Sequence, residues 1–313
     1  MISPEPVASS AGTISLTAAF PAERGKRMSK IGLVVEGGGM KCAYSAGILD
    51  KFLDDTICFD YVIGVSAGSA NCASFLAGQR ERNLRYYTEH LKRKEYFGFN
   101  SFLKTGDLFG LDFIYSTMTN HDGDDPLDYP KLSANPAEYE VVATNALTGV
   151  PAYFSGKQMS QDNYEIIKAS CALPAACRPR FINGTPYFDG GVSDPIPVDH
   201  ALRQGGCDKI VVILSKPRDF QKKPEHMRFF YSLRIMKYPK IVEALNNRHI
   251  SYMQRFRRVF ELEKEGKAFV FAPSRHLEMS TYAMDPEENR RLYDLGIEDY
   301  RNEKDRLGEF LTH

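Results

Sequence analysis

Short apolar runs alternate with segments of helical spacing along most of the chain. An apolar run of about five residues, bounded by polar residues or glycine, is typical of a strand buried on both faces of a sheet. Apolar residues that recur every three or four positions favour an amphipathic helix. Strands that alternate with helices predict an α/β fold, with a parallel or mixed sheet and helices on both of its faces.

These patterns assign the individual elements. Strands are predicted at residues 31–35, 59–63, 140–144, 209–214 and 268–272. Helices are predicted at residues 43–53 and 67–76, and an exposed, charged helix is predicted at residues 81–94. A terminal helix is expected to begin at Asp285-Pro286, because Asp is a favoured N-cap and Pro a favoured first helical residue.

The domain organisation follows from composition along the chain. Residues 1–28 are rich in Ser, Ala and Pro and lack a basic segment before their apolar run. We therefore expect a disordered lead there and not a signal peptide. Residues 29–313 are predicted to form one domain, in which residues 216–265 are a basic helical region and residues 266–313 a last strand and a terminal helix.

Overall composition excludes several classes of protein. The 313 residues are 43% apolar and carry 40 basic and 40 acidic side chains. The net charge is therefore near zero, and no global field attracts the chain to nucleic acid. The six cysteines show neither Cys-x-x-Cys pairs nor metal-ligand spacing with histidine, which favours reduced thiols and a cytoplasmic location. No apolar run reaches the ~20 residues that a membrane-spanning helix needs.

A candidate nucleophile lies in Gly64-Val-Ser66-Ala-Gly68. A predicted strand leads directly into this pentapeptide and a predicted helix leads directly out of it. This context is that of a nucleophile elbow, a crowded turn in which the positions two before and two after the serine must lack bulk. A plain turn with closely packed glycines is the alternative that the pentapeptide alone leaves open.

The run Gly37-Gly38-Gly39-Met40-Lys41 follows the first predicted strand and precedes a helix. Consecutive glycines at a helix N-terminus expose backbone amides that can bind a phosphate or an oxyanion. Cys42 stands where a dinucleotide fingerprint needs glycine and where a P-loop needs Ser or Thr, so both nucleotide motifs fail. An oxyanion hole is the better interpretation. Lys41 could hold the loop, contact an anionic head group or simply be solvated.

A candidate base lies in Asp189-Gly190-Gly191, within what we expect to be a long irregular loop rich in proline. An Asp-Gly turn is common, so the motif alone is weak. A serine hydroxyl nevertheless needs a base within hydrogen-bond reach. The histidines that follow do not lie in small-residue loops; His200 lies in a helical stretch. A Ser66–Asp189 dyad is therefore preferred to a triad.

These three motifs, in this order, resemble the patatin-like phospholipase family. The resemblance extends to Lys168-Ala-Ser-Cys-Ala-Leu-Pro174 and is clear over about residues 31–215. It implies a three-layer α/β/α fold with a mostly parallel sheet, hydrolysis of acyl esters of lipids, and no metal or organic cofactor. It also implies that Ser66 is the nucleophile and Asp189 the base, and that amides around Gly38 and Gly39 form the oxyanion hole. Cys42 departs from the glycine that is usual in the family.

A basic and aromatic segment spans residues 216–258. Such a segment could contact a membrane surface peripherally through anionic lipid head groups, or it could form helices that pack on the sheet with solvated arginines. No nucleic-acid-binding motif accompanies the charge. Two further hypotheses stay open: a non-catalytic lipid-binding or regulatory protein of the same fold, and a triad esterase that uses His200 or His276.

Overall fold

A single mixed sheet forms the centre of the protein. The structure is a computed structural model that describes residues 29–223, 234–276 and 284–312. The strand order is β5-β6-β3-β2-β1-β7-β8, with β4 paired to β3. The strands are β1 (Ile31–Val35), β2 (Tyr61–Val65), β3 (Glu138–Asn145), β4 (Pro151–Ser155), β5 (Arg180–Ile182), β6 (Thr185–Asp189), β7 (Lys209–Ile213) and β8 (Ala268–Phe271).

Helices connect the strands. The α-helices are α1 (Ala43–Asp54), α2 (Ala67–Leu76), α3 (Arg82–Tyr87), α4 (Phe99–Thr105), α5 (Tyr129–Ala134), α6 (Glu165–Cys171), α7 (Val198–Arg203), α9 (Pro239–Lys264) and α10 (Pro286–Thr312). Short 3₁₀ segments include η1 (Gly39–Cys42), η2 (His90–Lys92) and η5 (Gly190–Val192). Among the described residues, no helix is both long enough and apolar enough to cross a bilayer.

The sheet has a parallel centre and an antiparallel edge. β3, β2, β1, β7 and β8 are parallel neighbours, whereas β4, β5 and β6 pair antiparallel. β2 pairs with residues 138–142 of β3, and β6 pairs with residues 143–145, while β4 takes the other side of β3. The end of β6 therefore lies just beyond the carboxyl end of β2, so residues that follow the two strands meet.

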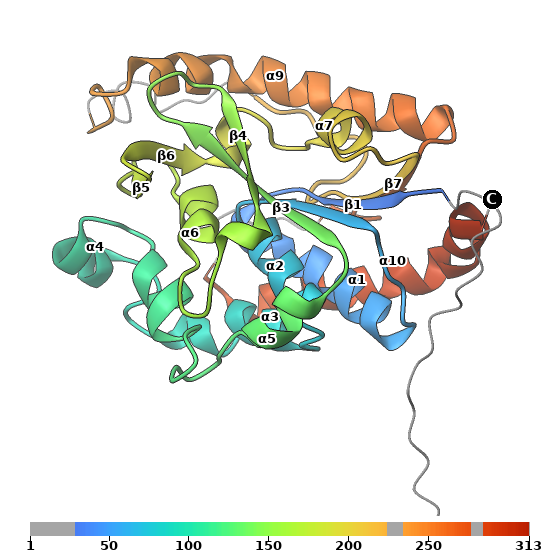
Figure 1. The fold of residues 1–313 in the computed structure, drawn as a ribbon, viewed down its shortest axis with the longest axis horizontal. Coiled ribbons are helices and arrows are strands. Elements are labelled where there is room, and N and C mark those ends of the chain that lie inside the picture. The colour runs from blue at the N-terminus through green and yellow to red at the C-terminus, as the bar shows by residue number, and fades with distance from the viewer. Residues whose placement is uncertain (1–28, 224–233, 277–283, 313) are drawn as a thin grey trace, which may run out of the picture.

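Successive strand residues face opposite layers, as the two-residue period of a strand requires. Leu33 and Val35 pack with α1, α2 and α10, whereas Val34 packs with α7 and α9. Figure 1 shows α7 and α9 on one face of the sheet and α1, α2 and α10 on the other. The three-layer α/β/α architecture with a mostly parallel sheet is thus confirmed.

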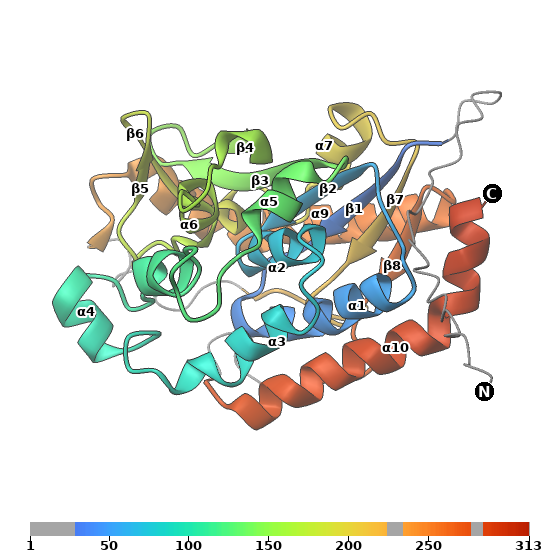
Figure 2. The ribbon, with the colours of Figure 1, turned by 60° about the horizontal axis from the view of Figure 1, so that its bottom comes forward.

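α10 forms the outer wall of one layer and lies along α1 (Figure 2). Two glycines allow the close crossing: a Cβ on Gly296 would lie 2.2 Å from the carbonyl oxygen of Tyr44, and a Cβ on Gly47 would lie 2.1 Å from that of Tyr293. Two tyrosines add buried hydrogen bonds, because Tyr293 donates to Asp50 at 2.7 Å and Tyr44 donates to Asp299 at 2.8 Å.

Two local predictions were wrong. The exposed helix expected at residues 81–94 is instead the short α3 followed by η2, and Leu84, Tyr86 and Tyr87 are buried. The charges there mislead because Arg82 is itself buried, with hydrogen bonds to Ser74 and to the Tyr86 hydroxyl. The irregular loop expected around Asp189 is largely the β5–β6 hairpin, since backbone pairing with β3 orders it.

The other strand and helix predictions are confirmed within one or two residues at most ends. Asp285 accepts a hydrogen bond from the amide of Glu287 at the start of α10, as an N-cap does. Residues 266–313 do contain a last strand, β8, and the terminal helix. The disordered lead expected at residues 1–28 lies outside the described residues, and the single-domain boundary of 29–313 stays a prediction.

Candidate active site

Ser66 occupies the turn between β2 and α2 in a strained backbone conformation. Its φ of 53° and ψ of −134° lie outside the regions that residues with a side chain prefer. The flanking glycines are required sterically: a Cβ on Gly64 would lie 2.5 Å from the Cα of Ser69, and one on Gly68 would lie 2.6 Å from the carbonyl oxygen of Glu36. This is the geometry of an elbow that presents a side chain at the end of a sheet.

Asp189 reaches Ser66 because of the strand register. Val65 pairs with Val142 of β3, and the next β3 residue, Ala143, pairs with Asp189. The Ser66 hydroxyl donates to Asp189 Oδ2 at 2.6 Å, and the amide of Gly191 donates to Asp189 Oδ1 at 2.7 Å. The structure thus brings together two residues that lie 123 positions apart in the sequence.

The backbone on either side of Asp189 is also held. The amide of Asp189 donates to the carbonyl oxygen of Ala172 at 2.8 Å, and Thr144 Oγ1 donates to the carbonyl oxygen of Asp189 at 2.8 Å. Gly190 fits only without a side chain, since its Cβ would lie 2.2 Å from the carbonyl oxygen of Val142. The Asp189 side chain therefore has little freedom to leave Ser66.

The environment of Asp189 makes its carboxylate more basic than usual. The side chain is 2% exposed, and burial raises its pKa because a charge loses hydration. The Ser66 hydroxyl, the positive charge of Arg248 and the Gly191 amide oppose this rise. Arg248 comes from α9, where its Nε donates to the carbonyl oxygen of Gly191 at 2.8 Å.

The predicted oxyanion loop packs directly on Ser66. A Cβ on Gly37 would lie 3.0 Å from the Cβ of Ser66, and Gly39, at the start of η1, has a φ of 56° that favours glycine. Within the described ranges, no acceptor binds the backbone amides of Gly38 or Gly39. Met40, the fourth predicted residue of the hole, is buried. These glycine amides are therefore available for an anionic oxygen beside Ser66.

A buried carboxylate, Glu36, holds this loop from behind. Its Oε2 accepts a hydrogen bond from the amide of Ser215 at 2.6 Å, and its Oε1 accepts one from the Tyr252 hydroxyl of α9 at 2.8 Å. Ser215 Oγ in turn donates to the carbonyl oxygen of Gly37 at 3.0 Å. The loop is thus tied both to the end of β7 and to the helix on the opposite layer.

Lys41 and Cys42, which follow Met40, differ in burial and in the direction of their pKa shifts. Cys42 is fully buried, and its Sγ donates to the carbonyl oxygen of Glu36 at 3.5 Å. Burial raises the pKa of this thiol, so it stays protonated. Lys41 is half-buried, and both burial and the neighbouring charge of Lys216 lower its pKa. Cys42 therefore adds a bond to the loop where the family has glycine.

Sequence reasoning gave no role to Ser170, yet it contacts the turn directly. The backbone amide of Ser66 donates to Ser170 Oγ at 2.8 Å, and Ser170 Oγ donates to the carbonyl oxygen of Val142 at 2.6 Å. Ser170 lies on α6 within the segment 168–174, which had been noted only as family-like. Through these two bonds Ser170 links the Ser66 turn to β3.

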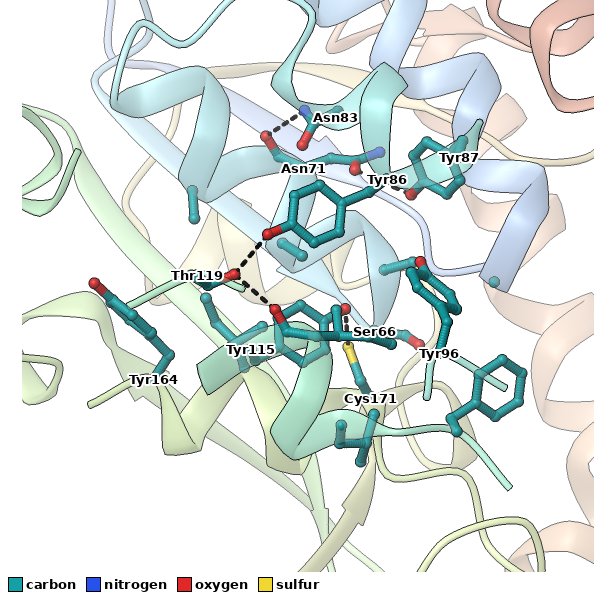
Figure 3. A pocket seen from close by; sticks show the side chains of 18 of the residues that line it. Ser66, Asn71, Asn83, Tyr86, Tyr87, Tyr96, Tyr115, Thr119, Tyr164 and Cys171 are labelled. Atoms are coloured by element: carbon teal, nitrogen blue, oxygen red, sulfur yellow. Dashed lines mark hydrogen bonds between the residues drawn. The ribbon is translucent and has the colours of Figure 1, made fainter. Parts of the chain in front are cut away.

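An aromatic pocket opens beside Ser66. It extends between α2, α3, the segment 96–119 and α6, and Tyr86, Tyr87, Tyr96 and Tyr115 point into it (Figure 3). Most of its wall is carbon, which suits an acyl chain. Segment 81–94, where an exposed helix was expected, supplies part of this wall through Tyr86 and Tyr87.

A second pocket meets the first at Ser66, Gly39 and Leu173. Its wall includes the glycine loop, Asp189 and cationic side chains from the segment after β7 and from α9. The two pockets therefore offer different environments on the two sides of the same hydroxyl.

The histidines proposed for a triad are engaged elsewhere. His200 Nε2 bonds Glu140 at 2.7 Å and its ring stacks on Tyr153, and His276 Nε2 bonds Asp219 at 2.9 Å. In the part of the chain that the structure describes, no cluster of three or more His, Cys, Asp or Glu side chains could hold a metal ion. The side-chain partner of the Ser66 hydroxyl is thus Asp189, whereas the bonds of His200 and His276 go to Glu140 and Asp219.

Comparison with known proteins places these features in context. Residues 33–202 match the family model of patatin-like phospholipases, and residues 238–312 match a domain of unknown function (DUF6363). The chain is 30% identical over 198 residues to the uncharacterized protein YjjU of Escherichia coli, which covers 63% of this chain and 55% of YjjU. The chain therefore spans about half the length of this curated relative.

Among solved structures, the crystal structure of VipD from Legionella pneumophila is similar over 91% of this chain and 67% of that chain. The sequence identity is 13% and the TM-score is 0.44. The first family model spans the glycine loop, Ser66 and Asp189, whereas the second spans α9 and α10.

Proposed function

The chain belongs to the patatin-like phospholipase family, and on this premise we propose that it is a carboxylic ester hydrolase that uses a Ser66–Asp189 dyad on lipid acyl esters. The observation that carries the proposal is the 2.6 Å hydrogen bond from the Ser66 hydroxyl to a buried carboxylate. A carboxylate acts as a base on a hydroxyl only when it is placed directly on it and partly desolvated, and Asp189 meets both conditions.

The proposed reaction has two steps. Ser66 Oγ attacks the ester carbonyl carbon as its proton passes to Asp189, and the amides of Gly38 and Gly39 donate to the resulting oxyanion. The alcohol leaves with the proton from Asp189, and an acyl group remains on Ser66. A water molecule then attacks this acyl group as Asp189 takes a proton from it. Asp189 returns that proton to Ser66 Oγ as the bond to the acyl group breaks, and the fatty acid is released with Ser66 and Asp189 restored.

The pockets fit the parts of such a substrate. The aromatic pocket suits the acyl chain because its wall buries carbon against carbon. Burial of Asp189 keeps its pKa raised, which makes it a stronger base than an exposed aspartate. Ser170, Glu36 and Arg248 act as positioning residues. Ser170 accepts from the Ser66 amide, Glu36 is held by Ser215, which bonds the glycine loop, and Arg248 donates to the carbonyl oxygen of Gly191.

The test is labelling by a fluorophosphonate, which reacts with activated serines. We expect wild-type protein to label, Ser66→Ala to lose the label, and Asp189→Asn to label weakly. Hydrolysis of p-nitrophenyl butyrate should fall on the order of a thousandfold in both variants, because the nucleophile and its base act as a unit. His200→Ala and His276→Ala are the matched controls for a triad and should keep both activities.

Three other outcomes of these experiments would contradict the proposed dyad. Label retained in Ser66→Ala would exclude this serine as the nucleophile. Loss of activity in His200→Ala would support the hypothesis of a catalytic triad that uses this histidine. A folded wild-type protein that neither labels nor hydrolyses, yet binds lysolipid, would support the non-catalytic lipid-binding hypothesis.

Peripheral contact with a lipid surface through residues 216–258 is a further proposal, narrower than the sequence suggested. The apolar face of α9 is not available for it, because Tyr252, Phe256 and Val259 are buried in the core cluster on this face of the sheet, and Leu245 is buried in the other cluster. Among the described residues of this segment, which leave out 224–233, two large apolar side chains are exposed: Met236 is 69% exposed and Ile250 is 52% exposed. Co-sedimentation with anionic vesicles that is unaffected by Met236→Asp would rule out this contact.

A further inference from the structure

The two pockets that meet at Ser66 differ in chemistry. The aromatic pocket is built mainly of carbon, whereas the second pocket carries the cationic side chains Lys216, Lys222 and Arg248. An ester bound with its carbonyl carbon at Ser66 projects its acyl chain to one side and its alcohol to the other. If the acyl chain enters the aromatic pocket, the alcohol lies among these three cations.

The three cations are held in place by their neighbours. Lys216 Nζ donates to Ser215 Oγ at 2.7 Å and lies 5.8 Å from the ring centroid of Phe220. Lys222 Nζ lies 5.9 Å from the ring centroid of Tyr252, a distance typical of cation–π contacts. These aromatic side chains also line the pocket, so the positive charges are positioned before any ligand arrives.

The carboxylates at this pocket are already engaged. Glu36 accepts from the Ser215 amide and the Tyr252 hydroxyl, and Asp189 accepts from Ser66 and the Gly191 amide. In the described part of the chain, Lys216 makes no ion pair with a carboxylate. Other cations of the basic segment do: Arg218 pairs with Glu263, Arg255 with Asp194, and Arg258 with Asp199.

The charge of Lys216 also acts on a neighbouring lysine. Lys41, beside the glycine loop, has a lowered pKa, for which burial and the charge of Lys216 are the causes. Burial disfavours a charge of either sign at this place, whereas the charge of Lys216 disfavours a further positive charge specifically. The alcohol part of a lipid ester carries a negative charge when it contains a phosphate.

Resting on the proposed hydrolase function, we infer that Lys216, Lys222 and Arg248 bind the phosphate of the leaving group. The preferred substrates are then acyl esters whose head group carries net negative charge, such as glycerophosphate or phosphoglycerol esters. A phosphocholine ester binds less well, because its quaternary ammonium enters the same cationic pocket. Phosphate recognition by Lys and Arg is charge-assisted and falls with salt.

Binding to the Ser66→Ala protein tests this inference without turnover. Isothermal titration calorimetry would compare monohexanoyl glycerophosphate with monohexanoyl glycerophosphocholine below their micelle concentrations. We expect the anionic ester to bind roughly tenfold more tightly, which corresponds to a difference of about 1.4 kcal/mol in binding free energy. Lys222→Gln and, separately, Lys216→Gln should each reduce this ratio about threefold, because each removes one charge. Lys223→Gln, the adjacent exposed lysine, should leave the ratio unchanged.

The outcomes separate the inference from the proposed function. Equal affinity for the two esters, or equal effects of Lys222→Gln and Lys223→Gln, would overturn the inference. So would inorganic phosphate binding as tightly as the anionic ester, since the site would then be one for free anions. Hydrolysis of p-nitrophenyl butyrate by wild-type protein reports separately on the hydrolase, because that ester has no phosphate.

Discussion

The two long helices near the C-terminus, α9 and α10, look alike in sequence but serve different parts of the molecule. Both are amphipathic, and both lie within the same match to a domain of unknown function. α9 sends Arg248 and Tyr252 to the Asp189 turn and to Glu36 behind the glycine loop. α10 instead packs on α1, on the other face of the sheet. The partners that a helix contacts, and not its amphipathic pattern, therefore decide how directly it can influence the site.

The largest effect we expect is a loss of stability when the packing of α10 on α1 is disturbed. Gly296→Ala places a Cβ 2.2 Å from the carbonyl oxygen of Tyr44, and backbone cannot move aside as a flexible side chain can. Overpacking of this kind should lower the free energy of unfolding by about 3 kcal/mol, measured by urea denaturation. Hydrolysis per folded molecule should be unchanged, because the neighbours of the added Cβ are Tyr44 and Ile48 of α1 and not Ser66 or Asp189.

Gly308→Ala in the same helix is the matched control, since nothing lies within 4 Å of its Cβ. It should raise stability slightly, because Ala favours a helix by up to about 1 kcal/mol over Gly. A fall in hydrolysis per folded molecule of Gly296→Ala would show that α10 does influence the site, and the contrast with α9 would fail.

A second effect tests the charge that α9 brings to Asp189. Burial raises the pKa of Asp189 and the charge of Arg248 opposes that rise. Arg248→Gln should therefore raise this pKa further and move the acid limb of the kcat/KM profile to higher pH. A base must be deprotonated to act. At a pH below the acid limb, kcat/KM should therefore fall roughly tenfold for each pH unit by which the limb moves up.

Arg248→Lys retains the charge but not the guanidinium that donates to the carbonyl oxygen of Gly191. If the role of Arg248 is electrostatic, Arg248→Lys should restore the acid limb toward its wild-type position. A limb that shifts equally in both variants would show that the hydrogen bond matters and the charge does not.

Much of the site could be predicted from short motifs because its chemistry is local. The glycine loop, Ser66 and Asp189 each stand in a short motif of three to five residues in which close neighbours leave no room for a Cβ at most glycines. The positioning residues could not be predicted in this way. Ser170 is 104 positions from Ser66, and Tyr252 is 216 positions from Glu36. Each is an ordinary polar residue on a helix, and only the strand order brings it to its partner.

The same limit explains the error at residues 81–94. Helical spacing and charge were visible there, but the burial of Arg82 depends on partners at Ser74 and Tyr86 and on the carbonyl oxygen of Asp125. A charged residue with that many buried partners cannot be told from a solvated one by sequence alone. The overall α/β architecture was easier to predict, because buried parallel strands give continuous apolar runs.

The smallest expected effect compares two tyrosines that make the same kind of bond. Tyr252 of α9 donates to buried Glu36 at 2.8 Å, and Tyr293 of α10 donates to buried Asp50 at 2.7 Å. Phenylalanine at either position removes a hydrogen bond to a carboxylate, worth about 1 to 3 kcal/mol. Tyr252→Phe should lower kcat about fivefold, because Glu36 positions the glycine loop. Tyr293→Phe should lower stability by about 1 kcal/mol and leave kcat unchanged.

The pH dependence of Tyr293→Phe sharpens this comparison. Burial raises the pKa of Asp50 to about 6 from an ordinary 3.8, and the Tyr293 hydroxyl opposes the rise. Because the folded state binds the proton more tightly than the unfolded state, burial of Asp50 weakens stability as pH rises from about 4 to about 6. Losing the hydroxyl raises this pKa further, so the deficit of Tyr293→Phe should be small at pH 4 and largest above pH 6. A deficit that is independent of pH, or a kcat that falls in Tyr293→Phe as it does in Tyr252→Phe, would remove the distinction between the two helices.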